Sequence, residues 1–236
     1  GLAGASLLLL SLAGLEGRIR NKKGFLAVCA VLVVAFAGFY LSGMTNVLAA
    51  LTAAASVAAL VGIGLLFALY PALRAQRQSW GAYGVHLGLV LLALGVAFSG
   101  PYKSEHEVVL AQGESVSIGE FTVTYAGLHE DRNVGDIVAR ATATLAVSKD
   151  GRDVGVLRPD KRIYKNFPNQ QFAEVGTIPS FGDELYATLL GLTEDNRASF
   201  KISINPLVNW IWIGGTIMCL LAFLLLRRIP RPGEVR

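Results

Sequence analysis

The stretch SWGAYGVHLGLVLLALGVAFS, residues 79–99, decides the fold, because it is uncharged, apolar and long enough for a helix that crosses a bilayer. At about 100° per residue, one face of this helix carries small side chains and the opposite face carries glycines. The first row is Ala82, Val90, Ala93 and Ala97, with His86 among them, and the second is Gly81, Gly84, Gly88 and Gly95. The glycine row predicts close packing against a neighbouring helix. The alanine row leaves low relief beside the imidazole, where a flat macrocycle could lie.

His86 is the one histidine inside this stretch. An ionisable side chain within a membrane is costly and indicates a functional role. The alternative is a packing role, in which His86 donates a hydrogen bond to a neighbouring helix. The residue alone does not choose between the two.

The composition indicates an integral membrane protein. Of 236 residues, 53% are hydrophobic and 16% are charged, and the mean hydropathy is +0.51. Residues 100–205 carry 11 Lys/Arg and 15 Asp/Glu, whereas the remainder carries 10 and 2. The basic residues flank apolar spans, so the pI of 9.2 indicates no nucleic-acid partner. Cys29 and Cys219 fall in predicted spans and form neither a disulfide framework nor a redox pair.

Apolar segments predict several membrane helices. The expected segments are a partial helix at 1–15 that begins upstream, spans at 24–42, 47–70 and 79–99, and a final span at 206–226 before a basic tail at 227–236. The loops with excess Lys and Arg all fall on one side of such an arrangement, which marks that side as cytoplasmic. We therefore expect a multi-pass protein of the inner (cytoplasmic) membrane, with residues 100–205 on the periplasmic side and a cytoplasmic C-terminus.

Residues 100–205 change from helical to alternating periodicity. Alternating apolar positions predict half-buried strands around Phe121, Ile137 and Phe200. Asp150-Gly151 is a two-residue hairpin signal, since a type I′ turn needs positive φ at both central positions. Several short strands predict an all-β domain, a small barrel or sandwich.

The polar residues of this predicted β domain name no reaction. His106 and His129 are separated in sequence, and two surface histidines are a simpler interpretation than a metal pair. The stretches with most individual character are RPDKRIY at 158–164, DELY at 183–186, which contains the motif ELY, and NPLVNWIWIGG at 205–215. The last is expected to begin a helix with proline in its first turn. The residue types leave open whether Arg162, Tyr164 and Tyr186 act or pack.

The order of these motifs resembles the C-terminal third of the CcmF family of cytochrome c-type biogenesis proteins, haem lyase subunits of the cytochrome c maturation system. The resemblance covers most of the chain and includes the histidine-bearing helix that ends in FS. It implies that His86 is an axial ligand of the iron of a membrane-embedded b-type haem. Imidazole is a standard haem ligand. The family's tryptophan-rich segment, its two external histidines and its second intramembrane ligand would all lie upstream of Gly1.

The resemblance implies part of a haem lyase that is incomplete on its own and supports covalent attachment of haem to apocytochrome c. The expected partners are the upstream half of the lyase or a separate subunit, other cytochrome c maturation proteins, apocytochrome c, a haem chaperone and the lipid bilayer. An alternative from another class is a membrane-anchored sensor or assembly scaffold, whose β domain binds a ligand or partner while His86 packs. A transporter is disfavoured because the spans carry no acid and no paired charges.

Overall fold

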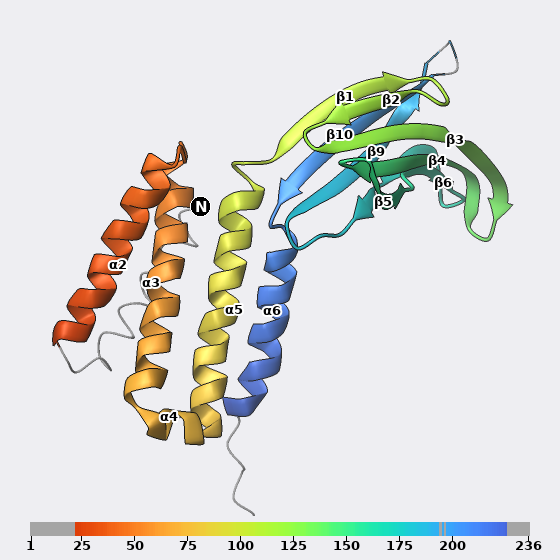
Figure 1. Ribbon diagram of the computed structural model, residues 1–236. Coiled ribbons are helices and arrows are strands. Elements are labelled where there is room, and N and C mark those ends of the chain that lie inside the picture. Colours follow the sequence, from red (N-terminus) through yellow and green to blue (C-terminus); the bar gives the residue numbers. More distant parts are fainter. Residues whose placement is uncertain (1–21, 194, 196, 226–236) are drawn as a thin grey trace, which may run out of the picture. The chain divides into compact units, whose positions relative to one another are not determined.

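The computed structural model describes residues 22–193, 195 and 197–225 (Figure 1). The chain divides into two compact units. The helical unit comprises the described residues before Tyr102 and after Pro206, and the β unit is Tyr102–Pro206. The partial helix expected at 1–15 and the basic tail expected at 227–236 lie outside the described residues.

The helices of the helical unit are mostly apolar. They are α2 (Lys22–Leu41), α3 (Val47–Leu69), α4 (Pro71–Ala75), α5 (Arg77–Ser99) and α6 (Asn209–Ala222), which continues into a 3₁₀ turn, η1 (Phe223–Leu225). Among the described residues, α3 and α5 are long and apolar enough to cross a membrane, while α2 and α6 contain shorter apolar segments. The membrane location and the sidedness inferred from the sequence stay predictions.

Local capping explains where α3 begins and ends. The side chain of Asn46 accepts a hydrogen bond of 3.0 Å from the backbone N–H of Ala49, which satisfies one of the free donors in the first turn. At the other end, Tyr70 leaves the helical conformation just before Pro71. Proline disfavours a helical residue in front of it and suits the first position of a helix, so α4 starts there.

The long helices pack in a row, α2 on α3, α3 on α5 and α5 on α6 (Figure 1). Small side chains line the contact between α3 and α5, where Ala55 and Ala59 are buried against Val90 and Ala93. The glycine row of α5 faces α6, as the sequence predicted: an added Cβ at Gly88 would lie 2.6 Å from the carbonyl oxygen of Gly214. Only residues without a side chain permit this approach.

The β unit consists of two antiparallel sheets (Figure 1). The four-stranded sheet has the order β1 (Ser104–Leu110), β10 (Ala198–Pro206), β9 (Asp183–Leu192) and β8 (Gly176–Ile178). The six-stranded sheet has the order β2 (Ser115–Ile118), β3 (Phe121–Val134), β4 (Ile137–Lys149), β6 (Asp160–Tyr164) and β7 (Phe167–Glu174), and β5 (Arg152–Leu157) also pairs with β4. The prediction of a β domain is confirmed, and of the two expected forms the structure has the sandwich.

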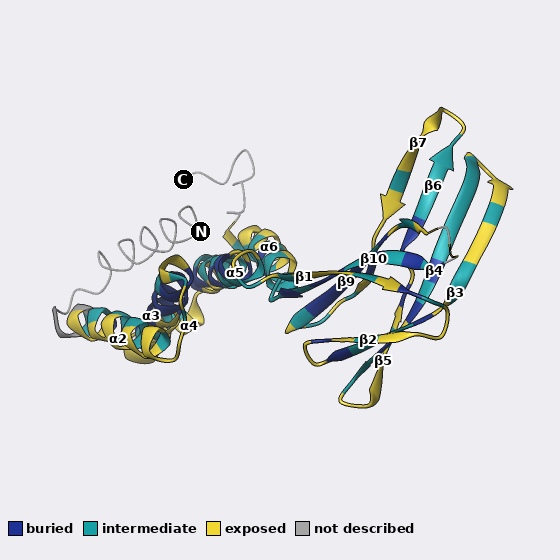
Figure 2. Cartoon of the chain, turned by 90° about the horizontal axis from the view of Figure 1, so that it is seen from above, coloured by how far each residue is buried: buried dark blue, intermediate teal, exposed yellow. Residues whose placement is uncertain are grey.

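The inward faces of the two sheets form one apolar core. Its largest fully buried side chains include Phe200, Leu145 and Leu189, contributed by both sheets. The ring of Tyr125 packs edge-on against Phe200 with centroids 5.2 Å apart. Burial does not extend over the whole six-stranded sheet: β7 is mostly exposed (Figure 2). The alternation of apolar residues read from the sequence thus corresponds to the inward face.

Two turns show where the sequence interpretation was right and where it was wrong. Asp150 and Gly151 have φ values of 51° and 76°, as a type I′ turn requires, and they join β4 to β5. Pro206, expected in the first turn of the final helix, is instead the last residue of β10, opposite Asp183. Leu207 then has φ of 56°, a left-handed conformation that separates the strand from the start of α6 at Asn209.

Candidate functional site

His86 lies in the middle of α5, on the face opposite the glycine row, and its side chain is partly buried. Its ring atom Nδ1 lies 2.7 Å from the carbonyl oxygen of Ala82, one turn earlier. A carbonyl oxygen only accepts, so Nδ1 is the protonated nitrogen of this bond. In the neutral imidazole the lone pair is then on Nε2. Among the described residues, no hydrogen-bond partner of Nε2 is found.

Aromatic packing holds the histidine ring from the side. The ring of Tyr83 lies 6.3 Å from that of His86, and Tyr83 is itself buried against Leu66 and Phe67 of α3. The tyrosine ring stands edge-on to Phe67 with centroids 5.1 Å apart. The imidazole is therefore positioned by its own helix and, through Tyr83, by the neighbouring one.

The alanine row is not open along its length. Val90 and Ala93 are each 1% exposed because α3 covers them. The low relief that the sequence predicted beside His86 remains on the side of Ala82, which is partly exposed. The low relief is therefore confined to the part of the row around Ala82.

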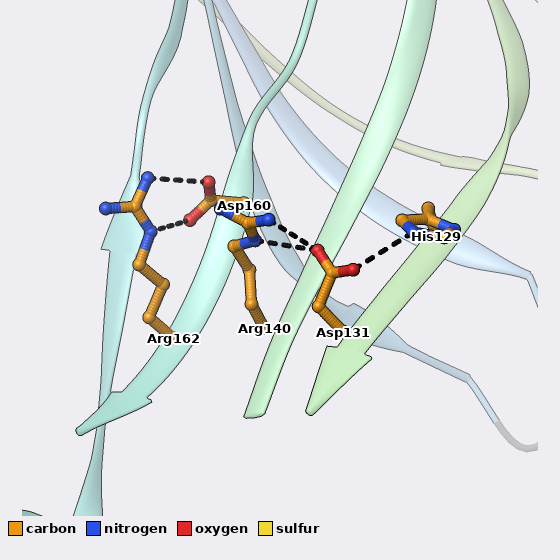
Figure 3. Close-up of polar contacts among 5 residues, drawn as sticks. All are labelled: His129, Asp131, Arg140, Asp160 and Arg162. Atoms are coloured by element: carbon orange, nitrogen blue, oxygen red, sulfur yellow. Dashed lines mark hydrogen bonds and ion pairs between the residues drawn. The ribbon is translucent and has the colours of Figure 1, made fainter. Parts of the chain in front are cut away.

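A second group of polar residues lies on the outward face of the six-stranded sheet. Asp131 of β3 stands opposite Arg140 of β4, and Arg140 in turn stands opposite Arg162 of β6. Figure 3 shows the two ion pairs that result, Arg140 with Asp131 and Arg162 with Asp160. Register, and not sequence proximity, assembles this group, since three strands contribute to it. We call these four residues, together with His129, the charged ladder.

The ion pairs of the charged ladder have the geometry of charge-assisted hydrogen bonds. Arg162 donates from Nε and Nη2 to the two carboxylate oxygens of Asp160, at 2.7 and 2.8 Å. Asp160 is only 6% exposed, so this bidentate pair satisfies an otherwise costly buried carboxylate. Arg140 donates to Oδ2 of Asp131, and Nε2 of His129 lies 3.1 Å from Oδ1. Those bonds, with Arg140 the stronger cause, lower the pKa of Asp131.

The ELY motif occupies a buried polar position in β9. Glu184 is 6% exposed, and its Oε2 has no hydrogen-bond partner in the part of the chain that the structure describes. Burial raises the pKa of Glu184, while a hydrogen bond from Tyr186 acts in the opposite direction. Burial also raises the pKa of the Tyr186 hydroxyl. Tyr186 therefore pairs with a carboxyl group and does not merely fill space.

The remaining polar positions singled out in the sequence separate in the structure. His106 is exposed on β1 of the four-stranded sheet, and His129 is exposed on β3 of the six-stranded sheet. No group of three or more metal-ligating side chains occurs among the described residues. Tyr164 packs edge-on against Phe172 with centroids 5.4 Å apart. Sequence reasoning singled out the stretch that contains Asp160 but gave that residue no role, and it missed Asp131 and Arg140, although the alternation of Arg140, Thr142 and Thr144 on one strand was a usable signal.

Comparison with known proteins agrees with the motif order. Residues 101–206 match the family model described as the CcmF C-terminal beta-sandwich. The chain is similar to the C-terminal part of CcmF. The resemblance expected from the sequence motifs is confirmed.

Individual relatives of the CcmF family support the same similarity. CcmF of Escherichia coli (strain K12) is 33% identical over 141 residues, which is 60% of this chain and 21% of that protein. CcmF of Pseudomonas aeruginosa is 29% identical over 144 residues, again 60% of this chain and 21% of that protein. The matches thus span about a fifth of the length of these relatives.

A solved structure is similar in fold to the helices as well as to the β unit. It is described as "Cytochrome c Heme Lyase CcmF", and it superposes with a TM-score of 0.79 at 24% identity. The match covers 94% of this chain and 38% of that one. The helical unit as well as the β unit therefore follows the CcmF fold.

Proposed function

We propose that this chain takes part in cytochrome c maturation as a membrane component and that His86 supplies one axial ligand to a b-type haem. The observation that carries the proposal is the hydrogen bond from Nδ1 of His86 to the carbonyl oxygen of Ala82, 2.7 Å long. It fixes the tautomer whose Nε2 carries the lone pair. Metal-ligating histidines generally donate their other ring N–H to a carbonyl or carboxylate in this way.

The residues around His86 suit a site in which this chain contributes one ligand to the iron. Backbone hydrogen bonding at Ala82 orients the imidazole, and Tyr83 restricts its rotation from the side. The chain has three histidines, and the other two belong to the β unit. A low-spin site needs two axial ligands, so the second would come from an upstream part of the lyase or from another subunit.

When bound, a b-type haem supplies one-electron redox chemistry, which would keep the iron of the substrate haem reduced. This chain's own residues would hold and orient one ligand of the iron, through the hydrogen bond of His86 to Ala82 and its contact with Tyr83. The reaction that the similarity suggests is thioether attachment of haem to the CxxCH motif of apocytochrome c. Other maturation proteins and a haem chaperone would act with the chain in that reaction, at the periplasmic side of the inner membrane.

The decisive experiment is spectroscopy of the assembled membrane complex, purified with the partner that carries the remaining lyase segments. The wild type should show sharp reduced b-type bands. His86→Ala should lose them or become high-spin while it still assembles, because the glycine row that packs α5 is unchanged. Added imidazole should restore low-spin bands in His86→Ala, since it replaces only the missing ligand.

The other two histidines provide the controls. His106→Ala and His129→Ala should leave the bands unaltered, because both side chains lie in the β unit. A low-spin spectrum that survives unchanged in His86→Ala would assign His86 to packing. The scaffold interpretation, with a partner-binding β domain, would then replace the haem-ligating one.

A further inference from the structure

A hollow of about 410 Å³ lies on the outward face of the six-stranded sheet, next to the charged ladder. Its lining is polar and comes from three neighbouring strands and one connection. The lining residues are His129, Asp131, Arg140, Thr142, Thr144, Arg158 and Asp160. The side chains of Arg140, His129 and the two aspartates form hydrogen bonds or ion pairs with one another or with Arg162.

The position of Arg158 follows from an unusual arrangement beside β4. Strands β5 and β6 lie end to end along the same edge of β4, and between them the carbonyl oxygen of Pro159 accepts a 2.9 Å hydrogen bond from the backbone N–H of Ala143. Leu157 stands opposite Leu145, and Asp160 stands opposite Thr142. The uninterrupted register between these pairs places Arg158 opposite Thr144, on the outward face.

The row that contains Arg158 also contains Thr144, and both residues line the hollow. On the other side of Thr144 the partner in β3 is Gly127, which has no side chain. A β-bulge between Tyr125 and Gly127 sets that register. Thr144 therefore has a glycine on one side and a long cationic side chain on the other. The side-chain amide of Gln112 lies beside Gly127, 3.1 Å from the position that an added Cβ would take, and Thr144 lines the hollow.

Three donors in the hollow have no partner among the residues that the structure describes. They are the guanidinium of Arg158 and the hydroxyls of Thr142 and Thr144. Arg158 is exposed, and the two threonines are partly exposed. A fork of N–H donors beside two hydroxyls matches the oxygens of a carboxylate.

The charges that line the hollow favour a singly charged anion over a dianion. Each carboxylate in the lining is paired with an arginine, Asp131 with Arg140 and Asp160 with Arg162, and Arg162 also lies 3.9 Å from Glu174 outside the lining. Arg158 is the cation of the lining that has no ion pair among the described residues. A singly charged carboxylate would complete the balance, whereas a phosphate dianion would face two nearby aspartates with only one free arginine.

The surroundings favour a protein partner over a small molecule. The hollow is open, as the 76% exposure of the His129 side chain shows, whereas small-molecule sites bury most of their ligand. On the same strand face, Tyr164 and Phe172 pack together beside Arg162, and Phe167 next to them is 55% exposed. Arginine with exposed aromatic residues is the composition of protein interfaces.

We propose that this outward face is a docking surface for an acidic segment of a partner protein, with one carboxylate of that segment held by Arg158, Thr142 and Thr144. The segment crosses β4 above Thr144 and then covers the aromatic group on β6 and β7. This surface lies wholly within the β unit, so the proposal stands without haem ligation by His86.

The test uses the full chain in nanodiscs, with threonine methyl groups labelled for NMR. The probe is the peptide acetyl-Gly-Glu-Gly-Glu-Gly-amide, and its glutamine counterpart is the matched neutral peptide. The acidic peptide should shift the methyl signals of Thr142 and Thr144, and the neutral one should not. Arg158→Gln should weaken binding at least about tenfold, because it removes a charge-assisted hydrogen bond.

Two further variants separate charge from shape. Arg158→Lys keeps the charge but loses the planar fork, so binding should fall between that of the wild type and Arg158→Gln. Arg152→Gln is the matched control, since Arg152 is an exposed arginine of β5 outside the hollow, and it should bind like the wild type. Dispersed methyl signals in each variant verify that the β unit is folded.

Four results would overturn the proposal. The first is an equal response to the two peptides, and the second is unchanged affinity in folded Arg158→Gln. The third is tighter binding of inorganic phosphate than of the acidic peptide, which would make the hollow a phosphate site. The fourth is the absence of any shift at peptide concentrations up to about 10 mM. Such a concentration would nearly saturate a site with a Kd of about 1 mM.

Discussion

Gly88 of α5 and Gly214 of α6 face each other at a helix crossing where neither position has room for a side chain. A Cβ added to Gly88 would lie 2.6 Å from the carbonyl oxygen of Gly214, and one added to Gly214 would lie 2.6 Å from the backbone N of Leu92. Both distances are below van der Waals contact. The contact joins helices more than one hundred residues apart in the sequence and fixes the face that α5 turns toward α6.

Gly88→Ala should therefore destabilise the helical unit. The added methyl meets backbone and the side chain of Met218, and overpacking of this kind costs about 1–3 kcal/mol. Gly64→Ala is the matched control, because a Cβ at that position of α3 meets nothing within 4 Å. Thermal unfolding of the full chain in detergent measures both. Equal unfolding midpoints for the two variants would contradict the close contact between α5 and α6 at Gly88.

The two faces of β9 should differ sharply in their sensitivity to truncation. Leu189 is 2% exposed in the core of the sandwich, whereas its neighbour Leu190 is 38% exposed. Leu189→Ala should cost about 2–5 kcal/mol, since it leaves a cavity, and Leu190→Ala should cost much less. Hydrogen exchange of the β9 and β10 amides in the full chain reports both changes. Similar losses of protection in Leu189→Ala and Leu190→Ala would contradict the assignment of one face of β9 to the core and the other to solvent.

Stability of the β unit should fall in acid through Glu105. Hydrogen bonds from Lys103 and then Lys201 lower the pKa of Glu105 to about 2. The folded state thus binds this proton less tightly than the unfolded chain, where the ordinary pKa is near 4.5. The stabilisation is present above that pH and is lost as the pH falls from about 4.5 to about 2.

Glu105→Gln should flatten this part of the pH profile of denaturant midpoints. Glu107→Gln serves as the control, because Glu107 is an exposed neighbour with no ion pair among the described residues. An acid limb equally steep in Glu105→Gln and in the wild type would assign the loss to other carboxylates.

The proposed topology can be checked by labelling in intact cells. In a Cys29→Ala, Cys219→Ala background, Gly151→Cys should react with a membrane-impermeant thiol reagent added from outside. Gln76→Cys should not react, because it lies in the basic connection between α3 and α5, which the charge bias places inside. Labelling of Gln76→Cys alone, or of both positions alike, would refute the sidedness.

Local chemistry made much of this fold predictable. The hairpin at Asp150-Gly151 and the apolar alternation around Phe121 depend on turn geometry and on the two-residue period of a strand, which neighbouring residues specify. The glycine row of α5 likewise follows from the period of a helix. These features require no knowledge of which segments meet.

The charged ladder was not predictable in the same way, because it depends on register between strands. Asp131 meets Arg140 only after the bulge at Gly127 has shifted the pairing of β3 with β4. Arg158 joins the same face because β5 and β6 continue one another beside β4. Pro206 was misplaced for a related reason: its pairing with Asp183 keeps it in the sheet, although proline also suits a helix start.

The pairing of β1 with β10 makes the β unit a removable insert. These strands are the first and last of the unit, and their antiparallel register sets Ser104 opposite Ile204, so the polypeptide enters and leaves at neighbouring points. Adjacent ends are what allows one domain to be spliced into another without disturbing it. A short linker in place of residues 104–204 would leave α5 and α6 as a helical hairpin closed by their own glycine contact. The β unit could equally be circularly permuted, with new ends opened at an exposed turn such as 150–151.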